Sequence, residues 1–304
     1  MSVRVIVPAS SANLGPGYDS FGLALGIHNE CEGLLSDEWR IEVGGEGAGQ
    51  LRGDAENAVL RAMARIFEEA GEPGLRAEVV CHNGIPVGRG LGSSSAAVIG
   101  GLVLGNALIG SRFDRQRLLE LASAIEGHPD NAAATLHGGF VIASRGSSDV
   151  RCTHIDPAGG LAAIVVVGEC ELPTGEARRA LPEVVPHADA AANAAAAALL
   201  AYGIATGSAP HIAGGMRDSI HERYRAHLVP DMALVSELLS TIGAGPAVLS
   251  GAGPSMLALV SAGNDAAALE KARRLAEVAR TALGEIGRGR VLALPIDRQG
   301  ARVV

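Results

Sequence analysis

The segment Pro86-Val-Gly-Arg-Gly-Leu-Gly-Ser-Ser-Ser-Ala-Ala97 decides how this chain is interpreted, because it joins two segments of different periodicity. Residues 75–81 read as a β-strand, and a helix is expected to begin at Ser93–Ser95. The alternating glycines at 88, 90 and 92 allow sharp turns and expose successive N–H groups. These groups and the helix dipole favour an anion, so the segment suits a polyphosphate. A plain strand-to-helix turn with serine N-caps is the alternative.

A second glycine-rich turn, Leu249-Ser-Gly-Ala-Gly-Pro-Ser-Met256, lies between two short apolar segments. Residues 247–250 and 256–260 read as strands, so a simple hairpin turn explains the segment when it is taken alone. Two glycine turns in one chain, however, favour a pocket whose walls are made of backbone.

Composition excludes several kinds of chemistry. The chain has 304 residues, 25 Lys+Arg and a formal net charge of −8, and Lys271 is its one lysine. Because neither glycine turn contains a lysine, a Walker-type P-loop ATPase is excluded. Lys271 stands in an ordinary helical run, which gives no support to a Schiff-base enzyme. The acidic balance argues against a nucleic-acid-binding protein, so we expect no nucleic-acid partner.

Cysteine spacing and the apolar stretches indicate a cytoplasmic protein. The four cysteines are widely spaced without a CxxC pair, which is typical of reduced thiols and not of a zinc site: Cys31, Cys81, Cys152 and Cys170. The first residues read as a strand and a loop, with no hydrophobic leader. Residues 96–109 and 194–201, the longest apolar stretches, are too short or too interrupted by glycine to span a bilayer. We therefore expect no membrane partner.

Hydrophobic periodicity predicts a mixture of strands and helices. Strands are expected at residues 3–7, 40–43, 75–81, 137–144, 161–167, 247–250, 256–260 and 290–296. Helices are expected at residues 57–70, from 93–95 onward, and at 115–126, 189–205, 233–243 and 264–283. Residues 9–19 are expected to form a loop. Because strands and helices do not alternate regularly, the pattern indicates an α+β fold in two halves, residues 1–155 and 156–304.

Three segments together resemble the GHMP kinase superfamily: PASSANLGPGYDSFG at 8–22, the glycine loop at 86–97 and LSGAGPSMLAL at 249–259. The first also resembles the homoserine kinase family within it, as do EGHPDN at 126–131, TGEAR at 174–178 and HERYR at 221–225. The resemblance spans nearly the whole chain in order. It implies an N-terminal domain like the second domain of ribosomal protein S5 and a C-terminal ferredoxin-like α/β plait. ATP and the substrate would bind between them.

The resemblance implies ATP-dependent phosphorylation of the L-homoserine hydroxyl in threonine biosynthesis, with Mg²⁺ as cofactor. The ATP loop would comprise Pro86, Val87, Gly88, Arg89, Gly90, Leu91, Gly92, Ser93, Ser94, Ser95 and Ala96. Asn57 resembles a position near the adenine, and its alternative is a helix N-cap. Ser93 and Glu126 are the implied Mg²⁺ ligands, with an N-cap and a solvated helix end as the alternatives.

Homoserine carries a carboxylate, an ammonium and a hydroxyl, so its site requires charged and hydrogen-bonding side chains. By resemblance, Arg178 and Arg225 would bind the carboxylate and Asp19 the ammonium. The nearby hydrogen-bonding residues would be Asn13, His128 and Thr174. Asn13 is alternatively a residue that only organises the loop at 9–19, because asparagine suits tight turns.

The proton acceptor is the least specified part of this site. Asp130 and Asn131 fall near the position where other GHMP kinases place an aspartate base, but no lysine is available near the N-terminus to assist it. The resemblance implies that the hydroxyl attacks the γ-phosphate directly. We therefore predict positioning roles for Asp130 and Asn131, with Asp130 as a base kept as the alternative.

Two other functions stay open at this point. A GHMP kinase for a different small alcohol is expected to lack the paired Arg178 and Arg225, and a catalytically silent nucleotide-binding regulator is expected to lose Glu126 or the loop serines. Because all of these residues are present, the sequence favours a homoserine kinase. A homodimer is compatible with the sequence, although no residue specifies one.

Overall fold

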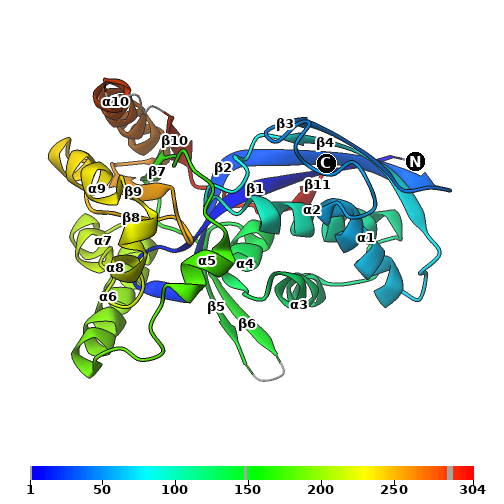
Figure 1. Ribbon diagram of the computed structural model, residues 1–304, viewed down its shortest axis with the longest axis horizontal. Coiled ribbons are helices and arrows are strands. Elements are labelled where there is room, and N and C mark those ends of the chain that lie inside the picture. Colours follow the sequence, from blue (N-terminus) through cyan, green and yellow to red (C-terminus); the bar gives the residue numbers. More distant parts are fainter. Residues whose placement is uncertain (1, 147–148, 286–289) are drawn as a thin grey trace.

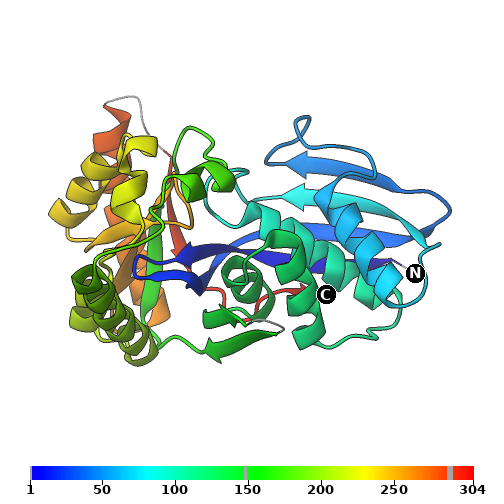
Figure 2. The same ribbon diagram turned by 60° about the horizontal axis from the view of Figure 1, so that its bottom comes forward.

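The computed structural model describes residues 2–146, 149–285 and 290–304, which form two lobes (Figures 1 and 2). Most of the first half of the chain folds around a mixed sheet ordered β11-β1-β2-β4-β3, and β5 pairs with both β2 and β6. Its strands are β1 (Val3–Asn13), β2 (Gly17–Ser36), β3 (Arg40–Gly45), β4 (Arg76–Asn83), β5 (Phe140–Arg145), β6 (Val150–Ile155) and β11 (Arg302–Val303).

The predicted loop at 9–19 is wrong, because these residues form the tip of a long hairpin. β1 continues through Pro8 to Asn13, and β2 begins at Gly17. The pairing between β1 and β2 shifts register between Pro8 and Ala9, and such irregularities accommodate a proline that cannot donate to the ladder. The turn itself uses left-handed backbone at Asn13 and Leu14. The sequence prediction also missed the 20-residue strand β2.

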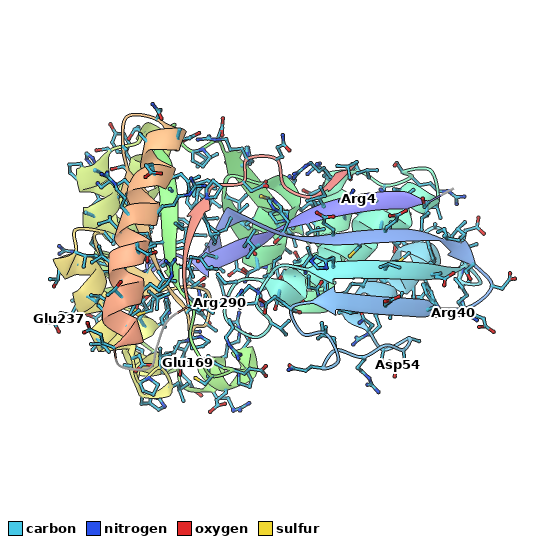
Figure 3. All side chains as sticks on the ribbon, turned by 90° about the horizontal axis from the view of Figure 1, so that it is seen from above. Arg4, Arg40, Asp54, Glu169, Glu237 and Arg290 are labelled. Atoms are coloured by element: carbon cyan, nitrogen blue, oxygen red, sulfur yellow. The ribbon has the colours of Figure 1, made fainter. Side chains whose placement is uncertain are left out.

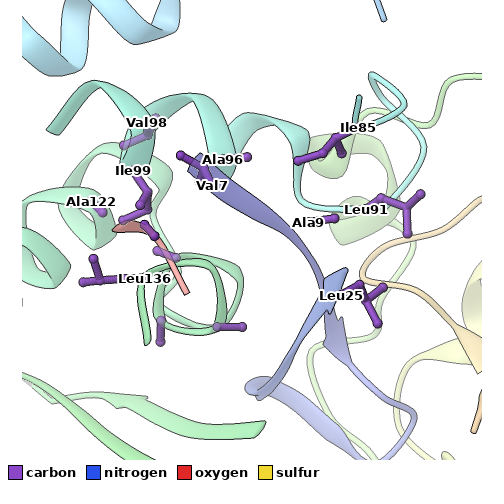
Figure 4. Close-up of a cluster of buried hydrophobic side chains, with 14 of the residues drawn as sticks. Val7, Ala9, Leu25, Ile85, Leu91, Ala96, Val98, Ile99, Ala122 and Leu136 are labelled. Carbon is purple, nitrogen blue, oxygen red and sulfur yellow. The ribbon is translucent and has the colours of Figure 1, made fainter. Parts of the chain in front are cut away.

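Four helices cover one face of this sheet: α1 (Ala58–Glu69), α2 (Ser93–Leu108), α3 (Arg115–Glu126) and α4 (Asp130–His137). The predicted starts of α1, α2 and α3 are confirmed to within a residue, whereas α4 was not predicted and occupies the start of the strand expected at 137–144. Gly101 lets α2 approach α1 closely, since a Cβ there would lie 2.3 Å from the Val59 carbonyl oxygen. Figure 4 shows the resulting core, including Val7 of β1 and Ile99 of α2.

The opposite face of the sheet is open (Figure 3). In β4, Ala77, Val79 and Cys81 are buried beneath the helices, while Glu78 and Val80 between them are exposed. This period of two is the pattern of a sheet with one covered face. It decides which side chains of β2 and β4 reach the interior.

The second lobe contains four antiparallel strands ordered β10-β7-β9-β8. They are β7 (Leu161–Val166), β8 (Ala247–Leu249), β9 (Met256–Ser261) and β10 (Val291–Pro295). In chain order within the lobe this is 4-1-3-2, with helices between the first and second and the third and fourth strands. That is the ferredoxin-like arrangement, so the predicted fold class is confirmed. The helix α10 (Asp265–Gly284) is capped by Asn264 as expected and buries a stripe of alanines against the sheet.

Five further helices belong to the second half of the chain: α5 (Thr174–Arg179), α6 (His187–Thr206), α7 (Ala209–Gly215), α8 (Glu222–Arg225) and α9 (Met232–Thr241). Among the described residues, α6 alone is long and apolar enough to cross a membrane by length and composition, which corrects the expectation for residues 194–201. It packs against α7, and Asn193 donates a hydrogen bond of 2.7 Å to the Pro16 carbonyl of the first lobe.

The last strand crosses back to the first lobe. β11 pairs with β1, although it follows β10 of the second lobe along the chain. The connection between β10 and β11 is held against β2, since the amide of Asp297 donates to the carbonyl of Ala24. The division into residues 1–155 and 156–304 stays a prediction, and β11 lies on the far side of that boundary from its partner strand.

Candidate active site

The two glycine turns and the hairpin tip meet between the lobes. Ser250 Oγ donates to the Gly90 carbonyl at 2.6 Å and lies 2.8 Å from Ser11 Oγ. The Gly251 amide donates to the Ala12 carbonyl at 3.0 Å. The prediction that the two turns share a backbone-walled pocket is therefore confirmed.

Two glycines of the first turn have no room for a side chain. Gly90 has a φ of +74°, and a Cβ would lie 2.3 Å from the Ser250 carbonyl oxygen. Gly92 has a φ of +69°, and a Cβ would lie 2.1 Å from Ser10 Oγ. Positive φ and close approach together require glycine at both positions.

Two adjoining cavities lie beside this junction. The first, about 420 Å³, is lined by Asn13, Asp19, Glu126, His128, Asp130, Asn131, Thr174, Arg178 and Arg225 together with residues of both glycine turns. The second, about 410 Å³, is lined by residues of β2, β4 and α1, among them Asn57, and by Val87. Gly88, Ser93 and Ser94 line both cavities. The structure thus brings together all the residues predicted for the substrate and metal.

The serines do not cap α2, so the alternative of a plain turn with serine N-caps is wrong. Its N-cap is Gly92, which makes no side-chain capping bond, and Ser93 to Ser95 form the first turn of the helix. The N–H groups of a first turn lack helical partners, so this end of α2 offers donors to an anion. Ser93 Oγ accepts a long hydrogen bond, 3.4 Å, from the Gly88 amide.

Glu126, the last residue of α3, lies directly beside this turn. Ser94 Oγ donates to its Oε1 at 2.7 Å and Ser95 Oγ to its Oε2 at 2.6 Å. The carboxylate is therefore engaged with the serines and is not simply a solvated helix end. The sequence analysis paired Ser93 with Glu126 as the metal ligands. In the structure, the serines that contact Glu126 are Ser94 and Ser95.

The donor set at Glu126 suits Mg²⁺. A carboxylate and serine hydroxyls are hard oxygen ligands, and Mg²⁺ commonly takes one or two carboxylates and completes its shell with phosphate oxygens and water. Within the described residues no group of three or more His, Cys, Asp or Glu side chains gathers as a metal cage. A cation at Glu126 would therefore depend on ligands from a bound nucleotide.

Asp19 and Arg178 form a two-pronged ion pair across the first cavity. Arg178 Nη2 donates to Asp19 Oδ1 at 2.7 Å and Nη1 donates to Oδ2 at 2.8 Å. This hydrogen bonding raises the pKa of the Arg178 guanidinium further. Tyr18, which sequence reasoning missed, accepts a third hydrogen bond from Arg178 at 3.0 Å and also lies beneath Arg225, whose guanidinium carbon is 5.5 Å from the ring centre.

Arg225 is 1% exposed and has unusual partners. Its Nε donates to the Ala177 carbonyl at 3.1 Å, and its Nη1 donates to His221 Nδ1 at 3.0 Å. The other nitrogen of His221, Nε2, donates to the Gly15 carbonyl at 2.8 Å. Burial lowers the pKa of His221, so the imidazole stays neutral and accepts from Arg225. Among the residues with described positions, no carboxylate forms a salt bridge with Arg225, so its charge remains available to a ligand.

His128, Asp130 and Asn131 form a connected group in the lining of the first cavity. Asp130 is 2% exposed, and its Oδ1 lies 2.7 Å from both His128 Nδ1 and the Asn131 amide. The hydrogen bond to Asp130 raises the pKa of His128. Asn131 Oδ1 accepts from Ser10 Oγ at 2.9 Å. The carboxylate is held by fixed donors, which supports the predicted positioning role of Asp130.

Asn13 and Asn57 use their amides within the protein. Asn13 donates to the Gly251 carbonyl at 2.7 Å and accepts from the Asp19 amide at 3.0 Å, so it organises the hairpin tip while lining the first cavity. Asn57 accepts from the Val59 amide and donates to the Arg52 carbonyl, which confirms the N-cap interpretation. Its position near an adenine stays a prediction.

Other residues of the predicted ATP loop face different surroundings. The side chains of Leu91 and Ala96 are packed in the core, so only their backbone is left to contact a nucleotide. Arg89 points to Glu171, 3.6 Å away, and lines a separate cavity with Pro86.

Comparisons with known proteins agree with this geometry. Residues 57–139 match the family model for the GHMP kinases N terminal domain. The chain is 40% identical to a homoserine kinase of Streptomyces coelicolor over all of its own length and 94% of the relative's. It is 42% identical to a homoserine kinase of Streptomyces avermitilis, with 90% of each chain covered. The crystal structure of homoserine kinase from Cytophaga hutchinsonii matches with a TM-score of 0.87 at 28% identity, covering 100% of this chain and 97% of that one.

Proposed function

Because the chain belongs to the homoserine kinase family, we propose that it transfers the γ-phosphoryl group of ATP to the side-chain hydroxyl of L-homoserine. The products are O-phospho-L-homoserine and ADP, and the reaction serves threonine biosynthesis. The observation that carries the proposal is one cavity lined by two arginines and a carboxylate together with the glycine loop and the start of α2.

The second cavity would hold the nucleoside of ATP, and the phosphates would lie over the first turn of α2. Gly88, Ser93 and Ser94 line both cavities, so a nucleotide spanning them passes the unsatisfied N–H groups of that turn. The loop contains no lysine. Phosphate binding therefore rests on backbone donors, the helix dipole and the cation.

Asp19 and Arg178 carry opposite charges that match the ammonium and the carboxylate of homoserine. The α-ammonium would bind Asp19, and the α-carboxylate would bind Arg178 and the buried Arg225. Charged hydrogen bonds of this kind are the stronger ones, especially where the partner is desolvated. The neutral His221 supports this role, since it orients Arg225 without neutralising it.

For the chemical step, Glu126 with Ser94 would hold Mg²⁺, which neutralises charge on the transferring phosphates. Ser93 stays a further candidate ligand. His128, Asn13 and Thr174 would orient the substrate, and Asp130 with Asn131 would fix the wall facing the hydroxyl. The hydroxyl attacks the γ-phosphate directly and its proton passes to the phosphoryl oxygens, so no dedicated base is required.

A coupled assay of ADP release tests the proposal. With Mg-ATP, purified protein should release ADP when L-homoserine is added, and should not respond to mevalonate or shikimate. Turnover of either alternative alcohol without turnover of homoserine would identify a different small-alcohol kinase. Nucleotide binding without any turnover would identify a silent regulator.

We also infer two domains at residues 1–155 and 156–304, apart from the returning strand β11. Cytoplasmic location, a homodimer, and the absence of nucleic-acid and membrane partners remain predictions. Sedimentation analysis of the purified protein tests the homodimer.

A further inference from the structure

Cys31 of β2 and Cys81 of β4 stand directly opposite each other in an antiparallel pair. Their sulfur atoms are 2.9 Å apart, and each residue is 2% exposed. The sequence places them 50 residues apart and gives no sign of their pairing. The register of β2 against β4 alone creates this dithiol.

The backbone geometry is compatible with a covalent bond between the two sulfurs. Directly opposed residues of antiparallel strands have Cα atoms about 4.5–5.5 Å apart, within the range of about 4.4–6.8 Å that disulfides span. A disulfide needs sulfurs at about 2.05 Å, so the pair has to close by less than about 1 Å. Side-chain rotation and small strand shifts are sufficient for this closure.

The pair also has a route to solvent. Both cysteines line the cavity of about 410 Å³ beneath α2, between the sheet and the start of that helix. A small reagent entering this cavity reaches the pair without unfolding of the sheet.

The remaining cysteines provide internal references. Cys170 is exposed and Cys152 is partly buried, and neither lines this cavity. The hydrogen bond with Cys81 and burial raise the pKa of the Cys31 thiol well above its ordinary value. The Cys31 thiol therefore stays protonated and reacts more slowly than an exposed thiol.

We propose that Cys31 and Cys81 form a modification site that converts reversibly to an intramolecular disulfide with small-molecule disulfides. One cysteine thiolate attacks a sulfur of the small disulfide, forms a mixed disulfide and expels one thiolate. The second cysteine then attacks the protein sulfur of that mixed disulfide and expels the other. Two protein thiols lose two protons and two electrons in total, and the small disulfide is reduced to two thiols.

The test follows the intact protein by mass spectrometry during incubation with cystamine. A variant with Cys152→Ala and Cys170→Ala keeps the pair alone and is expected to lose two hydrogen masses per chain without retaining the reagent. Peptide mapping should place the bond between residues 31 and 81, and reductant should reverse it. A pair that stays reduced after Cys170 of the wild-type protein has reacted completely would overturn the proposal.

Single variants separate the pair from general thiol reactivity. In the same background, Cys31→Ser and Cys81→Ser are each expected to gain one reagent adduct and to form no intramolecular bond. Circular dichroism checks that each variant is folded, and Cys81→Ala replaces Cys81→Ser if that variant fails. A folded single variant that takes up no reagent would contradict the assignment, because it would show that the cavity gives the reagent no access to the remaining thiol.

The link to nucleotide binding rests on the proposed function, and a separate arm tests it. If the nucleoside of ATP occupies this cavity, a non-hydrolysable ATP analogue should slow formation of the Cys31–Cys81 bond and leave the reaction of Cys170 unchanged. If the bond forms at an unchanged rate while the analogue is bound, the nucleoside does not bind in this cavity. The dithiol site itself would still stand.

Discussion

The proposed function gives the cavity a phosphate end and a substrate end, and the two are built differently. At the phosphate end the walls are backbone, shaped by Gly90 and Gly92 and fixed through Ser250. At the substrate end they are charged side chains, with Arg225 buried and Arg178 paired to Asp19. Backbone donors suit the phosphate chain of ATP, whereas charged side chains suit the ammonium and carboxylate of one amino acid. The contrast predicts that substitutions at the two ends separate the kinetic constants for ATP and homoserine.

The largest effect is expected at the substrate end, for Arg225→Met. Removing the buried charge that we propose for the substrate carboxylate should cost about 3 kcal/mol, or about a hundredfold in kcat/KM for homoserine. The KM for ATP should stay near the wild-type value. Arg223→Met, which alters an exposed arginine on the same helix, is the matched control and should leave both constants unchanged. An equal loss for ATP and homoserine would place Arg225 outside the substrate end.

The next largest effect is expected at the phosphate end, for Gly90→Ala. A Cβ at positive φ and 2.3 Å from a carbonyl oxygen should displace the loop, at a cost of about 2 kcal/mol or about thirtyfold in kcat/KM for ATP. Gly71→Ala is the control, because Gly71 has a φ of +76° with no neighbour within 4 Å of the added Cβ. If Gly71→Ala lowers kcat/KM for ATP as much as Gly90→Ala does, backbone strain and not displacement of the loop explains the result.

A smaller effect is expected for Arg178→Ala. Its side chain is 37% exposed, so losing its charged hydrogen bonds should cost about 1.5 kcal/mol, or about tenfold in KM for homoserine. ATP affinity should stay unchanged, and Arg179→Ala, one residue along the same helix, serves as control. A large loss of ATP binding would show that Arg178 belongs to the phosphate end.

The smallest effect on activity is expected for Glu222→Gln, a substitution whose main effect should be on stability. Glu222 Oε1 accepts from the Leu249 amide at 2.6 Å, and burial raises its pKa from an ordinary 4.5 to about 8. The unfolded carboxyl ionises above pH 4.5 while the folded one keeps its proton, so stability of the wild-type protein falls as pH rises through this window.

Glutamine has no proton to lose, so the variant should gain stability relative to wild type as pH rises from 5 to 8. Thermal unfolding at both pH values measures this difference, with an expected change of about 2 °C or more in Tm. Wild-type and variant curves that run parallel with pH would mean that Glu222 is ionised in the folded protein.

Local patterns predicted the parts of the fold that depend on neighbours in sequence. The apolar spacing after Asn57 located α1, and Asn264 located the start of α10. The strand β2 was not predicted because its residues, GIHNECEGL at 26–34, mix charge and glycine and show no clear apolar alternation. Its order comes from pairing with β1, β4 and β5, and such partners are invisible in a local window.

The candidate site divides in the same way. Family motifs indicated the arginines, Asp19 and the loop, and the structure gathers them in one cavity. Tyr18 and His221 were missed because their roles depend on contacts with Arg178 and Arg225 across the fold. Ser94 and Ser95 were passed over for Ser93 because the choice depends on where the first turn of α2 begins relative to Glu126.

The return of β11 to β1 means that both chain termini belong to the first lobe (Figure 1). The second lobe is therefore an insertion in the first, joined to it by two connecting segments, one after β6 and one after β10. The exit is anchored, because Asp297 Oδ2 lies 2.7 Å from His28 Nε2 in β2. A fragment of residues 1–155 would therefore lack β11 and leave one edge of the first sheet at β1.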